Sequence, residues 1–86
     1  MTIYVDAAIW RIGNKFRAHM TATTIPELHE FARNLGVASC WFEKPRRHPH
    51  YDITPDQREE AIRRGAVKVD SRELLQIAKD SRQHKP

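Results

Sequence analysis

Residues 2–6 and 16–22 alternate between apolar and polar side chains. The first segment, TIYVD, is rich in β-branched and aromatic residues, and the second is FRAHMTA. A period of two residues is typical of a β-strand with one buried face. The pair Gly13-Asn14 between them tolerates the positive φ of a tight turn, so the pattern predicts two antiparallel strands joined by a hairpin loop. The polar side of the second strand would carry Arg17, His19 and Thr21.

A first helix is predicted to begin at Thr24 and to end before Gly36. Thr24 is a suitable N-cap, a proline lies in the first turn, and Glu27 can complete a capping box. Glycine is typical of the position after a helix. The apolar stripe at helical spacing consists of Leu28, Phe31, Ala32 and Leu35.

Two further helices are predicted in the second half of the chain. Thr54-Pro-Asp-Gln57 repeats the capping pattern, and this helix would end near Gly65. Asp70 or Ser71 can cap a third helix. Its apolar positions include Leu74, Leu75, Ile77 and Ala78.

The remaining segments complete a single domain. VASCWF at residues 37–42 is short and apolar, which favours a buried strand, and AVKVD at 66–70 alternates like a short strand. Residues 43–49 are predicted to be loop because prolines bracket a charged segment. The predicted order is β-β-α-β-α-β-α, an α/β (α+β) domain over residues 1–80 with about four strands and helices packed on the sheet. The polar tail, residues 81–86, is expected to fray.

Composition adds a compartment and a class of partner. With 86 residues, 40% hydrophobic and 30% charged, the chain is expected to form one globular domain. No apolar run approaches the roughly 18 residues of a membrane span, and the first residues do not resemble a signal peptide. The single cysteine, Cys40, is expected in the core and fits a reducing compartment, so we expect a cytoplasmic protein. A net charge of +4 favours a nucleotide or nucleic acid as partner, although solubility explains it equally.

The stretch RRHPHYDITP, residues 46–55, concentrates the candidate chemistry. Arg46, Arg47 and His50 arrive just before a predicted helix N-terminus, where backbone N–H groups and the helix dipole favour an anion. Arginine suits phosphate because its planar fork donates two hydrogen bonds. Acidic residues in the first turn of the helix could satisfy the dipole instead. Tyr51 could stack on a base or sugar, or pack in the core.

Arg58 lies on the helix face that is predicted to meet the sheet, where an unpaired charge is costly. Its partner would be a phosphate or a carboxylate, with Asp52 and Asp6 as candidates. A purely structural pair with Asp52 is an equal alternative.

His19, His50, Asp6 and Asp52 together offer the nitrogen and oxygen donors of a divalent-metal site. Their spacing matches no compact metal motif, and each histidine taken alone also fits a surface position. As an alternative to metal binding, His50 could act as a general acid or base, with Asp52, His19 and Asp6 exchanging protons or orienting other groups.

The whole chain resembles Domain of Unknown Function 4031, a family of short bacterial and phage proteins. The likeness rests on YVDAAIW, AHM, ELHEFARNLG, PHYDIT followed by Arg58, RGAVKV and SRELL. The resemblance implies a small cytoplasmic α/β domain of unassigned activity and supplies no catalytic roles.

Two functions of different classes remain open from the sequence. The first is a domain that binds a phosphate-bearing ligand, a nucleotide or nucleic acid, near residues 46–55, with phosphoester hydrolysis as the reaction if it is an enzyme. The second is a non-catalytic interaction protein, such as a phage-encoded inhibitor or a nucleic-acid-binding accessory protein. A protein partner is possible under the second function, and the sequence does not decide the oligomeric state.

Overall fold

The computed structural model describes residues 2–7, 10–43 and 48–83. The order of strands and helices agrees with the sequence pattern, with β2 and β5 as additional strands. The elements are β1 (Ile3–Val5), β2 (Trp10–Ile12), β3 (Lys15–Ala22), α1 (Ile25–Leu35), the 3-10 helix η1 (Ser39–Trp41), β4 (Phe42–Glu43), β5 (His50–Ile53), α2 (Pro55–Arg63), β6 (Val67–Lys68) and α3 (Ser71–Gln83).

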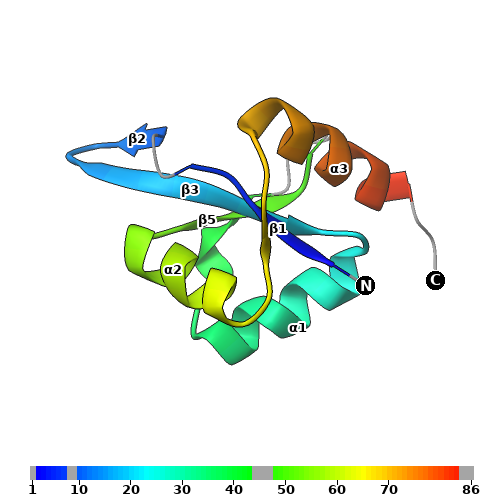
Figure 1. The fold of residues 1–86 in the computed structure, drawn as a ribbon, viewed down its shortest axis with the longest axis horizontal. Coiled ribbons are helices and arrows are strands. Elements are labelled where there is room, and N and C mark those ends of the chain that lie inside the picture. Colours follow the sequence, from blue (N-terminus) through cyan, green and yellow to red (C-terminus); the bar gives the residue numbers. More distant parts are fainter. Residues whose placement is uncertain (1, 8–9, 44–47, 84–86) are drawn as a thin grey trace.

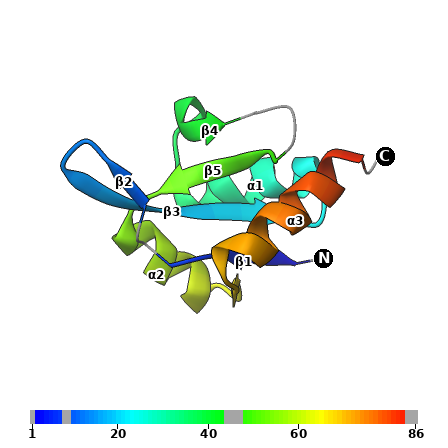
Figure 2. The same cartoon turned by 90° about the horizontal axis from the view of Figure 1, so that it is seen from above.

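The strands form one mixed sheet in the order β4-β5-β3-β1-β6, and β2 pairs with β3. β1 is antiparallel to β3, as predicted, and parallel to β6. Figure 1 shows α1 and α2 on one side of the sheet and α3 on the other. Figure 2 shows α3 lying over the C-terminal end of β3. The predicted fold class, a small α+β domain with helices packed on a sheet, is confirmed.

The alternation along β3 decides which residues enter the core. Ala18, Met20 and Ala22 are fully buried and belong to the apolar cluster under α1 and α2. The residues between them point to the opposite face because successive strand side chains alternate. On that face α3 buries Leu74 and Ala78.

Of the two predicted threonine N-caps, one makes its side-chain hydrogen bond and the other does not. The predicted capping box of α2 is present, since Thr54 Oγ1 accepts from the Gln57 N–H at 3.0 Å and Gln57 Oε1 accepts from the Thr54 N–H at 2.8 Å. Thr24 is the N-cap of α1, but its side chain makes no cap hydrogen bond. Gly36 ends α1 with φ at +87°, the left-handed conformation that glycine favours.

The prediction of a buried strand over residues 37–42 is wrong for most of its length. Ser39–Trp41 forms a 3-10 turn, and only Phe42 joins a strand from this segment. Cys40 is exposed, contrary to the expected core position. The apolar character of the segment serves instead to pack Trp41 and Phe42 against the core, while the turn directs Cys40 outward.

The second correction is β5, since no strand was predicted over residues 50–53. His50–Ile53 pairs with β3 on one side and with β4 on the other, which satisfies its backbone polar groups. Tyr51 and Ile53 are buried in the core. The strand therefore lies inside the sheet, and the positions between its core residues face the side that carries α3.

The C-terminal helix begins where the cap predicted it. Asp70 Oδ1 accepts a hydrogen bond from the Glu73 N–H at 2.7 Å. The helix continues through Gln83, so the first three residues of the tail expected to fray are helical. Ser81 is buried, and residues 84–86 lie outside the described part. Within residues 2–7, 10–43 and 48–83, no helix has the length and apolarity to cross a membrane.

Candidate functional site

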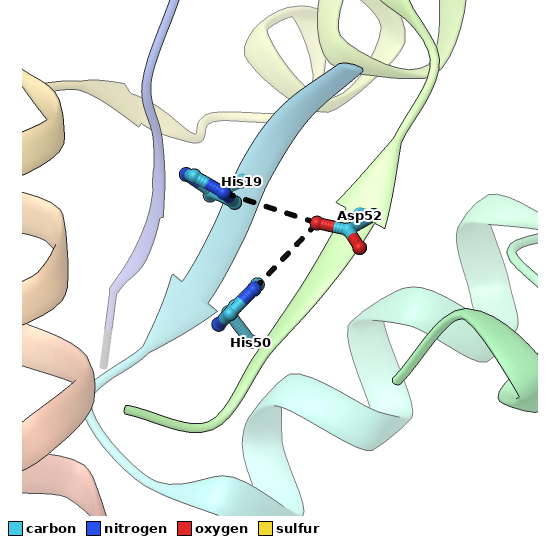
Figure 3. Close-up of side chains that lie close together, drawn as sticks. All are labelled: His19, His50 and Asp52. Carbon is cyan, nitrogen blue, oxygen red and sulfur yellow. Dashed lines mark ion pairs between the residues drawn. The ribbon is translucent and has the colours of Figure 1, made fainter. Parts of the chain in front are cut away.

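Strands β3 and β5 bring three potential metal ligands together on the face that carries α3. The register pairs His19 with Asp52, and His50 lies two positions along β5 on the same face. Figure 3 shows the three side chains converging. Asp52 Oδ1 lies 3.9 Å from His19 Nε2 and 3.6 Å from His50 Nε2. Residues 31 positions apart in sequence thus form one cluster, the His-His-Asp cluster.

Hydrogen bonds fix both imidazole rings through their Nδ1 atoms. His19 Nδ1 lies 2.7 Å from Asp6 Oδ2, and His50 Nδ1 lies 2.7 Å from the carbonyl oxygen of His48. A carboxylate and a carbonyl can only accept, so Nδ1 carries the proton in each ring. The second nitrogen of each ring, Nε2, faces Asp52.

Asp6 is the buried carboxylate that orients His19. Its Oδ1 accepts from the His19 backbone N–H at 2.6 Å, and its Oδ2 accepts from Ser71 Oγ at 2.8 Å. Burial alone would raise the pKa of Asp6, but the hydrogen bonds from His19 and Ser71 outweigh it and the pKa is lowered. Asp6 is therefore an ionised acceptor, placed directly after β1 beside His19.

The cluster has a donor set that suits a divalent metal. Its ligand atoms, two imidazole nitrogens and one carboxylate oxygen, lie within 4.8 Å of one another. Ligands on a tetrahedral zinc ion, with bonds of about 2.0–2.2 Å, are about 3.3–3.6 Å apart, so a small inward movement completes the geometry. The three side chains are 11–13% exposed, which leaves solvent access on one side. A histidine ligand oriented by a carboxylate through its other nitrogen, as His19 is by Asp6, is a common outer-sphere arrangement at metal sites.

Arg58 contacts the segment that carries Asp6. Its Nε donates to the backbone carbonyl of Asp6 at 2.6 Å, and its Nη1 pairs with Glu59 at 3.0 Å. Neither contact is the ion pair with Asp52 that was one of the alternatives, and the phosphate alternative stays a prediction. Arg58 fastens the segment that carries Asp6, which is a positioning function.

Tyr51 is unsuited to contact a phosphate or a base. The residue is 3% exposed and its side chain faces the core, because Tyr51 alternates with His50 and Asp52 along β5. Its hydroxyl lies 2.7 Å from His29 Nδ1, on the side of α1. Burial raises the pKa of Tyr51.

The anion site expected at the start of α2 stays a prediction. One first-turn N–H, that of Gln57, is used by the capping box. Arg46 and Arg47 lie outside the described residues. An open cavity of about 430 Å³ lies elsewhere, on the α1 face, where Ile3, Glu27 and Phe31 help to line it.

Two contributors to this face were not singled out from the sequence. Ser71 donates to Asp6 from the first residue of α3. Arg17 lies two positions before His19 on the same side of β3, with its guanidinium carbon 4.5 Å from the centre of the Trp41 ring. The alternation of β3 was the signal that could have found Arg17, since it shares the polar side with His19.

The fold and the cluster define a small α+β domain with a carboxylate-supported His-His-Asp cluster on one face of its sheet. The chain belongs to the family described as Protein of unknown function (DUF4031), whose model matches residues 3–81. No curated protein and no solved structure matches the chain. The resemblance noted from the sequence is thereby confirmed over nearly the whole chain.

Proposed function

We propose that the protein is a divalent-metal-dependent hydrolase of phosphoester bonds, acting on a nucleotide or nucleic acid at the His-His-Asp cluster. His19, His50 and Asp52 would hold the ion, and Asp6 would orient His19. The observation that carries the proposal is the convergence of two Nε2 atoms on Asp52 Oδ1, at 3.9 Å and 3.6 Å.

Hydrolysis is favoured because three protein ligands would leave a coordination position open on the ion. Catalytic zinc sites use three protein ligands, often two histidines and a carboxylate, and keep a further position for water or substrate. An ion held by His19, His50 and Asp52 would lower the pKa of bound water and polarise a phosphoryl oxygen. The chain's net charge of +4 supports an anionic substrate, because it favours encounter with phosphate-bearing molecules.

His50 has two possible roles, and metal dependence decides between them. If Nε2 binds the ion, His50 cannot also exchange a proton through that atom. Its Nδ1 is held by the carbonyl of His48 at 2.7 Å, which favours the ligand role. A metal-independent activity that disappears in His50→Gln would instead assign it as a general acid or base.

The test begins with Co²⁺, whose visible absorption reports its ligands, in a Cys40→Ser background that removes the exposed thiol. We expect one ion per chain in this parent and strongly reduced binding in His19→Ala and His50→Ala. Hydrolysis of bis(4-nitrophenyl) phosphate should require the ion and disappear in both variants. His29→Ala is the matched control, because its ring bonds Tyr51 on the α1 side and lies away from the cluster.

The interaction-protein alternative gives a different result. It is favoured if the parent binds no divalent ion at micromolar concentrations and does not hydrolyse bis(4-nitrophenyl) phosphate. Binding of a polyanion that falls log-linearly with salt, and that is unchanged in His50→Ala, would then describe the protein better.

A further inference from the structure

We infer that Arg17 binds a non-bridging phosphoryl oxygen of a phosphodiester, with Trp41 holding the guanidinium beside the metal site. This inference rests on the proposed function and names the substrate class of the same cluster. Arg17 takes the place of Arg58 and Tyr51 as the proposed phosphate contact, since Arg58 is hydrogen-bonded to the Asp6 carbonyl and Tyr51 is buried.

The position of Arg17 follows from the register of the sheet. Arg17 and His19 share one face of β3, and His19 is paired with Asp52 on β5. Trp41 directly precedes Phe42 of β4, and Phe42 is paired with Tyr51. β4 lies on the edge of β5 that is away from β3. A guanidinium that starts on β3 and lies over the Trp41 ring therefore reaches across β5, alongside Asp52.

The hydrogen-bonding state of Arg17 differs from that of Arg58, Arg63 and Arg64. Arg58, Arg63 and Arg64 each pair with a glutamate. Among the described residues, the buried Arg17 Nε has no hydrogen-bond acceptor. A buried donor without an acceptor is costly, and such groups in native proteins call for an explanation such as a bound ligand. Contact with an aromatic face, with the guanidinium carbon 4.5 Å from the centre of the Trp41 ring, holds the guanidinium in place.

Charge favours a diester over a monoester. With both histidines neutral as ligands, a divalent ion, Asp6, Asp52 and Arg17 together carry a single positive charge. Arg58 and Glu59 neutralise each other nearby. A phosphodiester carries one negative charge and balances the site, whereas a dianionic monoester exceeds it.

The reaction is an ordinary hydrolysis. Water adds its oxygen to phosphorus, one P–O ester bond breaks, and the leaving oxygen takes a proton, which gives a phosphomonoester and an alcohol. Arg17 would contact a phosphoryl oxygen whose negative charge grows as water adds, so it would be a catalytic residue in the sense of touching the reacting group.

The test measures anion binding directly and does not need turnover. In the Co²⁺-loaded Cys40→Ser parent, dimethyl phosphate should show paramagnetic broadening of its ³¹P signal, and methyl phosphate should bind more weakly. Arg17→Met should weaken dimethyl phosphate binding by about tenfold to 100-fold, the value of a charge-assisted hydrogen bond, and leave Co²⁺ affinity within about twofold.

The matched control is Arg11→Met. Arg11 is exposed and is paired with Phe16, so its side chain lies on the opposite face of the hairpin from that of Arg17. The Arg11→Met substitution therefore removes the same charge without touching the proposed site. Arg17→Lys keeps the charge but loses the fork, and Trp41→Leu removes the ring. For both variants the affinity for dimethyl phosphate should lie between that of the parent and that of Arg17→Met. These variants keep the inference testable if Arg17→Met does not fold.

Three outcomes overturn the inference in distinguishable ways. Equal dimethyl phosphate binding by the parent and Arg17→Met removes Arg17 from the site and leaves the metal proposal standing. Tighter binding of methyl phosphate than of dimethyl phosphate rejects the diester. A parent that binds no Co²⁺ rejects the proposed function, and the inference falls with it.

Discussion

Asp6 shows how one buried carboxylate can serve both folding and chemistry. It joins three parts of the chain, since it accepts from His19 on β3 and from Ser71 on α3 and its carbonyl accepts from Arg58 on α2. An ionised carboxylate with this many donors is stable only where they are all in place. Removing the carboxylate should therefore lower the stability of the fold and release the orientation of the His19 ring.

Asp6→Asn tests this double role. The amide keeps the shape but offers one acceptor, so a donor from His19 or Ser71 is left unsatisfied and stability should fall by about 1–3 kcal/mol. Metal affinity should fall by about 10–100-fold, as for loss of other outer-sphere partners. Urea unfolding and Co²⁺ titration measure the two effects. Ser71→Ala, which keeps the carboxylate, is the milder control, and unchanged Co²⁺ affinity in Asp6→Asn would contradict the role.

Tyr51 gives a prediction for alkaline pH. Burial raises its pKa above 10.0 in the folded protein, so the folded state holds the phenol proton more tightly than the unfolded chain does. The stability present below pH 10 should be lost as pH rises through the folded pKa. Tyr51→Phe should lack this loss in thermal unfolding across that range, although it forfeits the bond to His29. A parent and variant with the same alkaline profile would show that Tyr51 is not responsible.

The two threonine N-caps differ in a way that sequence alone does not reveal. Both precede a helix with proline in its first turn. Thr54 makes a reciprocal capping box with Gln57, whereas the Thr24 side chain makes no cap hydrogen bond. Only the first should therefore contribute to helix stability through its side chain.

Replacing each threonine by alanine separates the two cases. Thr54→Ala should destabilise the protein by about 1 kcal/mol, the usual effect of losing an N-cap. Thr24→Ala should cost a small fraction of that. Chemical denaturation of the pair measures the difference, and equal losses would mean that the cap contacts of α2 are not what stabilises it.

Local signals predicted the helices better than the middle of the sheet. The capping pattern at Thr54 and the glycine after α1 act within a few residues, so they are legible in sequence. The apolar run at residues 37–42 gives no period, and a short apolar run cannot distinguish a strand from a turn that packs on the core. HYDI does alternate, but its polar content and the preceding Pro49 hid β5 until its partner strands were known.

The candidate site was predictable as a set of residues but not as a geometry. His19, His50, Asp6 and Asp52 were all expected to act together, and all four lie together. The pairing of β3 with β5 places them, and strand pairing is a long-range choice that the local pattern does not contain. The same pairing turned Tyr51 away from the site and brought Arg17 toward it.

The whole domain should be stabilised by the ion it is proposed to bind. The ligands come from two strands, so the unfolded chain has no preformed site and binding favours the folded state. At a free concentration of 100 times Kd the gain is about 2.7 kcal/mol, or about 10–20 °C in Tm for a domain of this size. Scanning calorimetry with and without Co²⁺ measures it. His50→Ala should show no shift, and a parent that melts at one temperature in both conditions would contradict the site.

The two-sided use of β3 limits how this protein can vary. Arg17 and His19 lie on the face of the His-His-Asp cluster, whereas Ala18, Met20 and Ala22 lie in the apolar interior. Deleting or inserting a single residue within that strand would exchange the two faces, moving Met20 to the side that carries α3 and an imidazole into the interior. Substitution can therefore tune ligand preference side chain by side chain, but the length of the strand is not free to change, and library designs should hold it constant.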